Sequence, residues 1–329
     1  MQLRELLTDV DVLDVRGDAT VDVRALAHDS RAVDPGACFA CVVGATTDGH
    51  EYAPAAVAAG AVALLVERRL DLAVPEARVR DVRRALGPAA ARLQGFPSRA
   101  MRCLGVTGTN GKTTTTHLLG AIAEAAGEPA GVVGTVGARI DDRSLPLEHT
   151  TPEAPELQAL LARMRDDGVR AVAMEVSSHA LAQHRVDGTW FTVACYTNLS
   201  RDHLDYHASL DDYFEAKARL FHPGFTAAAA VNVDDPRGPE LVRRCRAVGV
   251  PVTSYGLDAP ADVTAADVRV DREGGRFTIV EADGTRTPAH TPLLGALNVA
   301  NALAAAVTAR LAGFDAAASA AASASGVCA

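Results

Sequence analysis

The feature that most restricts the fold of this chain is a regular alternation of apolar strands and amphipathic helices between residues 103 and 247. A strand–helix–strand order places successive strands parallel and covers them with helices. We therefore expect a mostly parallel sheet, with ligands bound at the carboxyl ends of its strands. The predicted strands are 103–107, 131–136, 171–176, 192–197 and 227–233, and the predicted helices are 113–126, 153–166, 210–221 and 238–247.

Two further regions flank this alternation. Residues 1–98 mix strand-like runs, such as 37–43 and 61–66, with Gly and Pro turns, and end in the linker-like sequence Gly95-Phe96-Pro97-Ser98. Residues 261–282 alternate apolar and polar side chains, which predicts a hairpin with its turn at Gly274-Gly275, and a helix is expected over 298–311. We expect an α/β domain at 1–98, a second at 99–315 and an Ala/Ser tail at 316–329.

Composition excludes several classes of protein. The chain has 329 residues, 48% hydrophobic and 22% charged, which is typical of a soluble globular protein. No apolar run is long enough to cross a membrane, and the N-terminus lacks the features of a signal peptide, so we expect a cytoplasmic protein without a membrane partner. The net charge of −9 disfavours nucleic-acid binding. We further expect a monomer.

The six cysteines are scattered, and only Cys38 and Cys41 are close together. This pair lies in an apolar run, where buried thiols are a simpler interpretation than redox chemistry. No second pair exists that could complete a zinc site. We therefore expect structural thiols.

Only two of the 32 basic residues are lysine, Lys112 and Lys217. A codon bias toward arginine accounts for the surface, but it does not explain which two positions kept lysine. Arginine cannot replace lysine where a compact ammonium meets a phosphate, or where a neutral amine must react. Both lysines are therefore candidate functional residues.

A glycine loop follows the strand at 103–107 and leads directly into the helix at 113–126. In this arrangement backbone N–H groups and the helix dipole face a bound phosphate. Lys112 is expected to contact the terminal phosphates of ATP, and Thr113 is expected to bind Mg²⁺. The general pattern has its first glycine at position 106, where this chain has Val106. The loop consists of Gly108, Thr109, Asn110, Gly111, Lys112, Thr113 and Thr114.

Metal-binding side chains follow two other predicted strands. Glu175 lies near the end of strand 171–176, and the polar segment 198–207 follows strand 192–197. Either could be a solvated loop, but beside a nucleotide site they suggest magnesium coordination. Lys217 lies in a predicted helix, where a carbamate made from lysine and CO₂ would provide an anionic oxygen ligand that arginine cannot supply.

These segments resemble the Mur ligases, and within them the UDP-N-acetylmuramoyl-tripeptide synthetases, which add the third amino acid of the bacterial cell-wall peptide. The segments that carry the resemblance are 108–114, Thr150-Thr151-Pro152, 175–181, Gln183-His184-Arg185, 198–207 and Ala216-Lys217. Upstream, 29–31 and 44–49 look like the uridine-nucleotide segment of the family, and downstream 295–301 looks like its adenine-side helix.

The resemblance implies an α/β fold with a uridine-nucleotide-binding domain at 1–98 and a P-loop-type ATPase domain at 99–315. It implies a peptidoglycan-synthesis ligase that uses ATP and Mg²⁺. The implied substrates are UDP-N-acetylmuramoyl-L-alanyl-D-glutamate and a third amino acid, diaminopimelate or lysine, joined through an acyl phosphate.

The resemblance also implies a role for each site residue. The implied catalytic residues are Lys112, Lys217, Glu175 and His203. Thr113, Glu175, His203 and carbamylated Lys217 would bind metal. Ser30, Thr150, Thr151, Ser177, Gln183 and Arg185 would bind the UDP-muramoyl dipeptide, and Asn298 and Asn301 would lie near the adenine.

Members of this family continue beyond the helix at 298–311 with a further domain that binds the incoming amino acid. We therefore expect little tripeptide synthesis from these 329 residues alone. A truncated gene product, half of a split enzyme and a non-catalytic nucleotide-dependent binder are the alternatives. Truncation is favoured, because the tail at 316–329 ends without a designed cap. Ala45, Thr46 and His149 differ from the usual family residues, and Ala45 and His149 motivate the binder as an alternative. A ligase similar to folylpolyglutamate synthase would share the glycine loop but not the uridine-type N-terminal domain.

Overall fold

The structure is a computed structural model that describes residues 1–44, 46–140, 143–202 and 206–315. The predicted tail at 316–329, Ala45 and the candidate metal ligand His203 lie outside the described residues. The chain forms two compact units. One consists of residues 1–97 with 153–162 and 183–189, and the other contains the remainder, 98–152, 163–182 and 190–329.

The N-terminal unit is built on a five-stranded sheet in the order β1-β5-β4-β3-β2. The strands are β1 (Val12–Arg16), β2 (Ala25–Ala27), β3 (Ala37–Ala40), β4 (Ala63–Val66) and β5 (Glu76–Val79). Four of them are parallel, and β1 joins β5 antiparallel. The helices are α1 (Leu3–Leu6), α2 (Ala53–Ala58) and α3 (Val82–Leu93), with 3-10 turns η1 (Ser30–Ala32) and η2 (Gly49–Tyr52).

The larger unit is built on an eleven-stranded sheet in the order β16-β15-β14-β13-β12-β11-β6-β10-β7-β8-β9. Its parallel centre contains β6 (Arg102–Thr107), β7 (Ala130–Gly134), β10 (Ala171–Glu175), β11 (Phe191–Tyr196), β12 (Thr226–Asn232) and β13 (Val252–Gly256). At one end β8 (Gly137–Ile140) and β9 (Arg143–Leu145) are added antiparallel. At the other end β14 (Val263–Asp271) is parallel to β13, and β15 (Gly274–Glu281) and β16 (Arg286–Thr291) follow antiparallel. The predicted α/β class with a mostly parallel sheet is confirmed.

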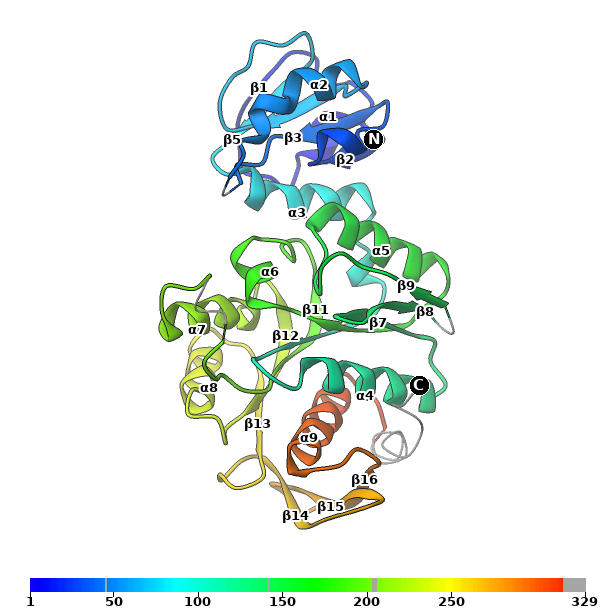
Figure 1. Cartoon of the computed structure of the whole chain (residues 1–329), viewed down its shortest axis with the longest axis vertical. Helices are drawn as coiled ribbons and strands as arrows, with labels where there is room; N and C mark the ends of the chain where they lie inside the picture. The colour runs from blue at the N-terminus through cyan, green and yellow to red at the C-terminus, as the bar shows by residue number, and fades with distance from the viewer. Residues whose placement is uncertain (45, 141–142, 203–205, 316–329) are drawn as a thin grey trace. The chain divides into compact units, whose positions relative to one another are not determined.

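Helices cover this sheet as the alternation predicts. They are α4 (Lys112–Ala125), α6 (Ser178–Ala182), α7 (Leu210–Ala218), α8 (Gly238–Ala247) and α9 (Ala296–Leu311), and η4 (Arg219–Phe221) follows α7. Most of the predicted helix α5 (Ala154–Asp166) is instead assigned to the N-terminal unit. Helices α4 and α9 pack side by side against one face of the sheet (Figure 1). Their contact buries Leu118, Leu119 and Leu303 in one apolar core with the strands. Each such side chain contributes about 1.5–3 kcal/mol when fully buried, so this core holds α4 against the sheet.

The predicted hairpin forms between β14 and β15, but the expected position of its turn was wrong. Gly274 and Gly275 begin β15, and the turn lies at Arg272 and Glu273. A Cβ on Gly274 would lie 2.0 Å from the carbonyl oxygen of Thr291. These glycines are therefore needed for close packing against the neighbouring strand and α9.

The prediction of structural thiols is confirmed for the described cysteines, which are all buried and free: Cys38, Cys41, Cys103, Cys195 and Cys245. Burial raises the pKa of Cys38 to about 12, so its thiol stays protonated at neutral pH. Within the described part of the chain, no helix is long and apolar enough to span a bilayer.

Candidate nucleotide and ligase site

The glycine loop joins β6 to α4 and passes close to two neighbouring segments. Gly111 has φ +86°, the left-handed region that favours glycine, and directly precedes the first residue of α4. A Cβ on Gly108 would lie 1.9 Å from Oγ1 of Thr197, and one on Gly111 would lie 2.3 Å from Oδ1 of Asn301. Val106 lies within β6, so the loop begins at Gly108. A helix N-terminus presented by such a loop can bind a phosphate through its N–H groups.

The two lysines meet at this loop. Nζ of Lys112 donates to the carbonyl oxygens of Gly108, at 2.9 Å, and Thr109, at 2.8 Å. Nζ of Lys217 donates to the same Gly108 oxygen at 2.8 Å and lies 4.2 Å from the ring centroid of Tyr213. Burial lowers the pKa of Lys112. The pKa of Lys217 is well below its usual value, because its amine is buried and the charge of Lys112 is nearby.

Glu175 is buried at the end of β10 and faces the start of α4. Its Oε1 accepts a hydrogen bond from Oγ1 of Thr113 at 2.9 Å and one from the backbone N–H of Thr135 at 2.9 Å. Carboxylate and hydroxyl oxygens are ligands that Mg²⁺ prefers, so the Glu175–Thr113 pair suits that ion. Within the described residues, no group of three or more His, Cys, Asp and Glu side chains is arranged to hold a metal.

A row of hydroxyl groups continues from Glu175. Oγ1 of Thr135 lies 3.1 Å from Oγ1 of Thr150. Thr151 donates to the backbone oxygen of Glu175 at 2.9 Å and accepts from the N–H of Ser177 at 3.2 Å. The structure thus brings three of the predicted substrate residues, Thr150, Thr151 and Ser177, next to the predicted metal ligand.

The segment after β11 braces the glycine loop. The N–H of Thr109 donates to the backbone oxygen of Asn198 at 2.9 Å, and the N–H of Asn110 donates to Oδ1 of Asn198 at 2.9 Å. Nδ2 of Asn198 in turn donates a hydrogen bond to the carbonyl oxygen of Asn110 at 3.1 Å. The Asn198 side chain therefore binds both the N–H and the carbonyl group of one loop residue, Asn110.

The two asparagines predicted near the adenine lie in the first turns of α9. Nδ2 of Asn301 donates to Oδ1 of Asn298 at 3.1 Å, and Nδ2 of Asn298 donates to the carbonyl oxygen of Leu294 at 2.9 Å. Asn301 is the residue that approaches Gly111, so the structure places it at the glycine loop.

The other predicted substrate residues belong to the N-terminal unit. Ser30 begins η1, which Asp29 caps by accepting from the N–H of Arg31 at 2.9 Å. Arg185 forms an ion pair with Glu153 at 3.0 Å and donates to Oε1 of Gln183 at 2.7 Å. Gln183 and Arg185 are thereby brought together.

Known proteins similar to this chain are ligases that use the same kind of domain. The Mur ligase middle-domain model matches residues 106–309, and the model of the Mur ligase catalytic domain matches residues 22–100. The chain belongs to the Mur ligase family. It is 45% identical over 314 residues to the UDP-N-acetylmuramoyl-L-alanyl-D-glutamate–2,6-diaminopimelate ligase of Geobacter sulfurreducens, covering 93% of this chain and 61% of that protein. The ligase of the same name from Streptomyces coelicolor is 42% identical over 306 residues, covering 91% of this chain and 60% of that protein.

Solved Mur ligases have the same architecture. A structure of a UDP-N-acetylmuramoyl-L-alanyl-D-glutamate–2,6-diaminopimelate ligase superposes with a TM-score of 0.86 at 32% identity, covering 97% of this chain and 65% of that one. MurF from Acinetobacter baumannii, at 21% identity and a TM-score of 0.68, shows the fold alone. The chain thus spans slightly less than two thirds of the length of the diaminopimelate ligases compared here.

Sequence reasoning missed two contributors to this Mur ligase site. Tyr213 lies four residues before Lys217 in α7, so the helical spacing could have placed its ring beside the amine. Thr135 follows β7 directly, at the same sheet edge as Glu175, but nothing in its local sequence marks it. Both residues contact groups that the sequence did single out.

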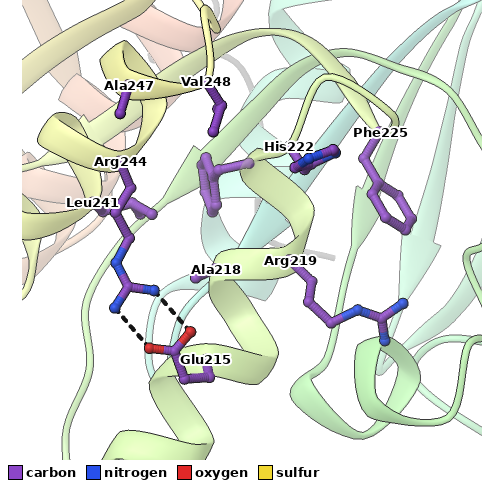
Figure 2. A pocket seen from close by; sticks show the side chains of 10 residues that line it. Glu215, Ala218, Arg219, His222, Phe225, Leu241, Arg244, Ala247 and Val248 are labelled. Carbon is purple, nitrogen blue, oxygen red and sulfur yellow. Dashed lines mark hydrogen bonds and ion pairs between the residues drawn. The ribbon is translucent and has the colours of Figure 1, made fainter.

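The opposite face of α7 in this Mur ligase lines a separate pocket of about 520 Å³. Glu215, Ala218 and Arg219 recur at helical spacing on this face, whereas Tyr213 and Lys217 lie on the other. Figure 2 shows the Glu215 carboxylate paired with both terminal nitrogens of Arg244, each at 2.7 Å. None of the predicted site residues that the structure describes lines this pocket, so it is distinct from the glycine-loop site.

Proposed function

We propose that this Mur ligase chain binds ATP and UDP-N-acetylmuramoyl-L-alanyl-D-glutamate for the ATP-dependent addition of diaminopimelate in peptidoglycan synthesis. Diaminopimelate is favoured over lysine because the relatives compared above are named as diaminopimelate ligases. The observation that carries the proposal is the convergence of Lys112, Lys217 and the Glu175–Thr113 pair on one glycine loop.

The proposed reaction has two steps. A glutamyl carboxylate oxygen of the UDP-muramoyl dipeptide attacks the γ-phosphorus of ATP, and the bond to ADP breaks, which leaves an acyl phosphate. The amine of diaminopimelate then attacks the acyl carbon, loses a proton and displaces phosphate. The task of the protein is positioning and charge stabilisation. Lys112 would turn from the loop carbonyls to the phosphates, and the first N–H groups of α4 would hold them.

Magnesium fits the oxygen ligands of Thr113 and Glu175, and the bound ion would neutralise phosphate charge. The position of the Glu175 carboxylate is fixed by Thr135, whose backbone N–H donates to Oε1 and whose hydroxyl donates to Oε2. His203 is proposed as a further ligand on the family resemblance. Asn298 and Asn301 are proposed to bind the adenine from the start of α9.

Lys217 is proposed to carry a carbamate. Only a neutral amine attacks CO₂; the new N–C bond forms as the nitrogen loses a proton, giving an anionic –NH–COO⁻ group. The lowered pKa of the buried Lys217 favours the neutral amine near neutral pH. The carbamate would reverse the local charge beside Lys112 and relieve the repulsion between the two cations.

The substrate residues divide between the two units. We propose that residues 1–98 bind the uridine nucleotide, with Ser30 in its loop, and that residues 99–315 bind ATP. The hydroxyls of Thr150, Thr151 and Ser177 would bind the peptide part of the substrate beside Glu175. Arg185, fixed by Glu153, would pair with a substrate anion, as a planar guanidinium suits a carboxylate or phosphate. A cytoplasmic location is part of the proposal, because both nucleotides are made there.

Isothermal titration calorimetry tests the proposal on the 329-residue chain. The titrants are MgATP, UDP-N-acetylmuramoyl-L-alanyl-D-glutamate, and the same nucleotide without the glutamate. We expect binding of MgATP and tighter binding of the dipeptide than of the shorter form. A chain that binds MgATP but neither muramoyl nucleotide would overturn the ligase assignment and favour the alternative, a nucleotide-dependent binding protein. Binding of a reduced folate instead would favour the folylpolyglutamate alternative.

A further inference from the structure

Three adjacent parallel strands end side by side at the nucleotide site. In the sheet, β11 lies between β6 and β12. The glycine loop follows β6, residues 197–200 follow β11, and the turn 233–235 follows β12, whose last residue is Asn232. Residues 197–200, which we call the bracing segment, therefore lie between the glycine loop and this turn.

On one side the bracing segment is bonded to the glycine loop. Besides the contacts of Asn198, Oγ1 of Thr197 donates to the carbonyl oxygen of Asn110 at 2.7 Å. The N–H of Ser200 donates to Oγ1 of Thr109 at 2.9 Å. The position of Thr109 and Asn110 is therefore set by where the bracing segment lies.

On the other side the bracing segment is held by two side chains, one from the end of β12 and one from the turn after it. Nδ2 of Asn232 donates to the carbonyl oxygen of Thr197 at 2.7 Å. Oδ2 of Asp235 accepts from the N–H of Leu199 at 2.7 Å. The second oxygen of Asp235 accepts from the hydroxyl of Tyr196 and the N–H of Arg237, each at 2.9 Å. Asp235 as a whole residue is 7% exposed.

We propose that Asp235 is a positioning residue for nucleotide binding, acting through Leu199 and Asn198 on the glycine loop; this rests on the proposed function. The three groups that point at its carboxylate here are all donors. Hydrogen bonds to a buried carboxylate are stronger than those between neutral groups. An asparagine has the same shape, but its NH₂ group would face one of these donors. Arg237 and Tyr196 share one oxygen, so an amide oxygen that keeps both bonds leaves the NH₂ group facing Leu199, and we expect Asp235→Asn to break the bond to Leu199.

The chain supplies a matched control in the preceding residue. Asp234 also accepts three N–H groups, from Leu257 at 2.6 Å, Asp258 at 3.1 Å and Ala259 at 2.7 Å. These belong to the connection between β13 and β14. Asp234 is exposed, unlike Asp235, but Asp234→Asn disturbs a cap on the same number of groups beside the same strand without touching the bracing segment.

The first experiment is hydrogen exchange of the free chain, resolved to single amides. In Asp235→Asn we expect exchange at Leu199, Thr109 and Asn110 to accelerate by about tenfold, as expected for loss of one charge-assisted hydrogen bond. In Asp234→Asn those three amides should exchange as in the wild type. Equal acceleration in both variants, or none in Asp235→Asn, would overturn the proposal. Should Asp235→Asn fail to fold, Asn232→Ala breaks the bond to Thr197 and should accelerate exchange at Asn110.

The second experiment is the affinity for MgATP. Asp235→Asn should weaken it by about tenfold, whereas Asp234→Asn should leave it within about twofold. If both variants lose affinity equally, Asp235 is merely structural. If the wild-type chain does not bind MgATP, the proposed function fails, and the exchange experiment alone still decides whether Asp235 positions the loop.

Discussion

Lys112 and Lys217 donate hydrogen bonds to the same acceptor, the backbone carbonyl oxygen of Gly108, at 2.9 and 2.8 Å. They are the only lysines of the chain and lie 105 positions apart, 217 minus 112. Two ammonium groups on one carbonyl oxygen repel each other, and both are largely withdrawn from water. A phosphate beside Lys112 or a carbamate on Lys217 would balance this charge. The pairing thus explains why lysine was kept at two positions in a chain that otherwise uses arginine.

Lys112→Arg should weaken MgATP binding at least tenfold, although the positive charge is kept. The ammonium sits between two loop carbonyls, at 2.9 Å from Gly108 and 2.8 Å from Thr109, where a planar guanidinium does not fit. Calorimetry on the wild type, Lys112→Arg and Lys112→Met measures this. Unchanged affinity in the arginine variant, with loss in the methionine variant, would show that charge alone suffices. Unchanged affinity in both variants would show that the loop assignment is wrong.

Lys217→Arg should abolish a carbamate signal that the wild type gives in ¹³C NMR with ¹³C-labelled bicarbonate. A guanidinium stays protonated near neutral pH and does not attack CO₂. Lys112→Arg serves as the control and should keep the signal, because Lys217 remains. A wild-type spectrum without a carbamate resonance, at pH 8 and saturating bicarbonate, would refute carbamylation.

Lys217→Met should flatten the rise of stability with pH. The pKa of Lys217 in the folded chain lies well below its usual value, and in the unfolded chain it returns to about 10.4. Between these two values the unfolded chain binds more protons, so the free energy of unfolding of the wild type increases with pH. Urea unfolding from pH 7 to pH 10 in CO₂-free buffer measures the slope. An equal slope in the variant would mean that Lys217 is not shifted downward.

The sequence predicts best where one local pattern decides the structure. The strand–loop–helix run from β6 to α4 specifies the phosphate loop, because glycines and helical spacing are local signals. The contribution of Asp235 is not readable in this way, because its donors include Tyr196 and Leu199, which lie far away in sequence. Gly274 misled the hairpin prediction for the same reason, since its partner Thr291 is brought to it only by the neighbouring strand.

A final prediction concerns Gly111→Ala. This substitution destabilises the fold in two ways, by backbone strain and by a clash with Asn301, and the two can be measured separately. Gly111→Ala forces an alanine into φ +86°, which costs about 1–2 kcal/mol, and places its Cβ 2.3 Å from the Asn301 amide oxygen. In an Asn301→Ala background the second cost disappears and the first remains. We therefore expect Gly111→Ala to reduce the free energy of unfolding less in that background than in the wild type. A double-mutant cycle by urea unfolding measures the difference. Additive effects would mean that Asn301 does not lie against the glycine loop, which would also remove the reason to place it beside the nucleotide.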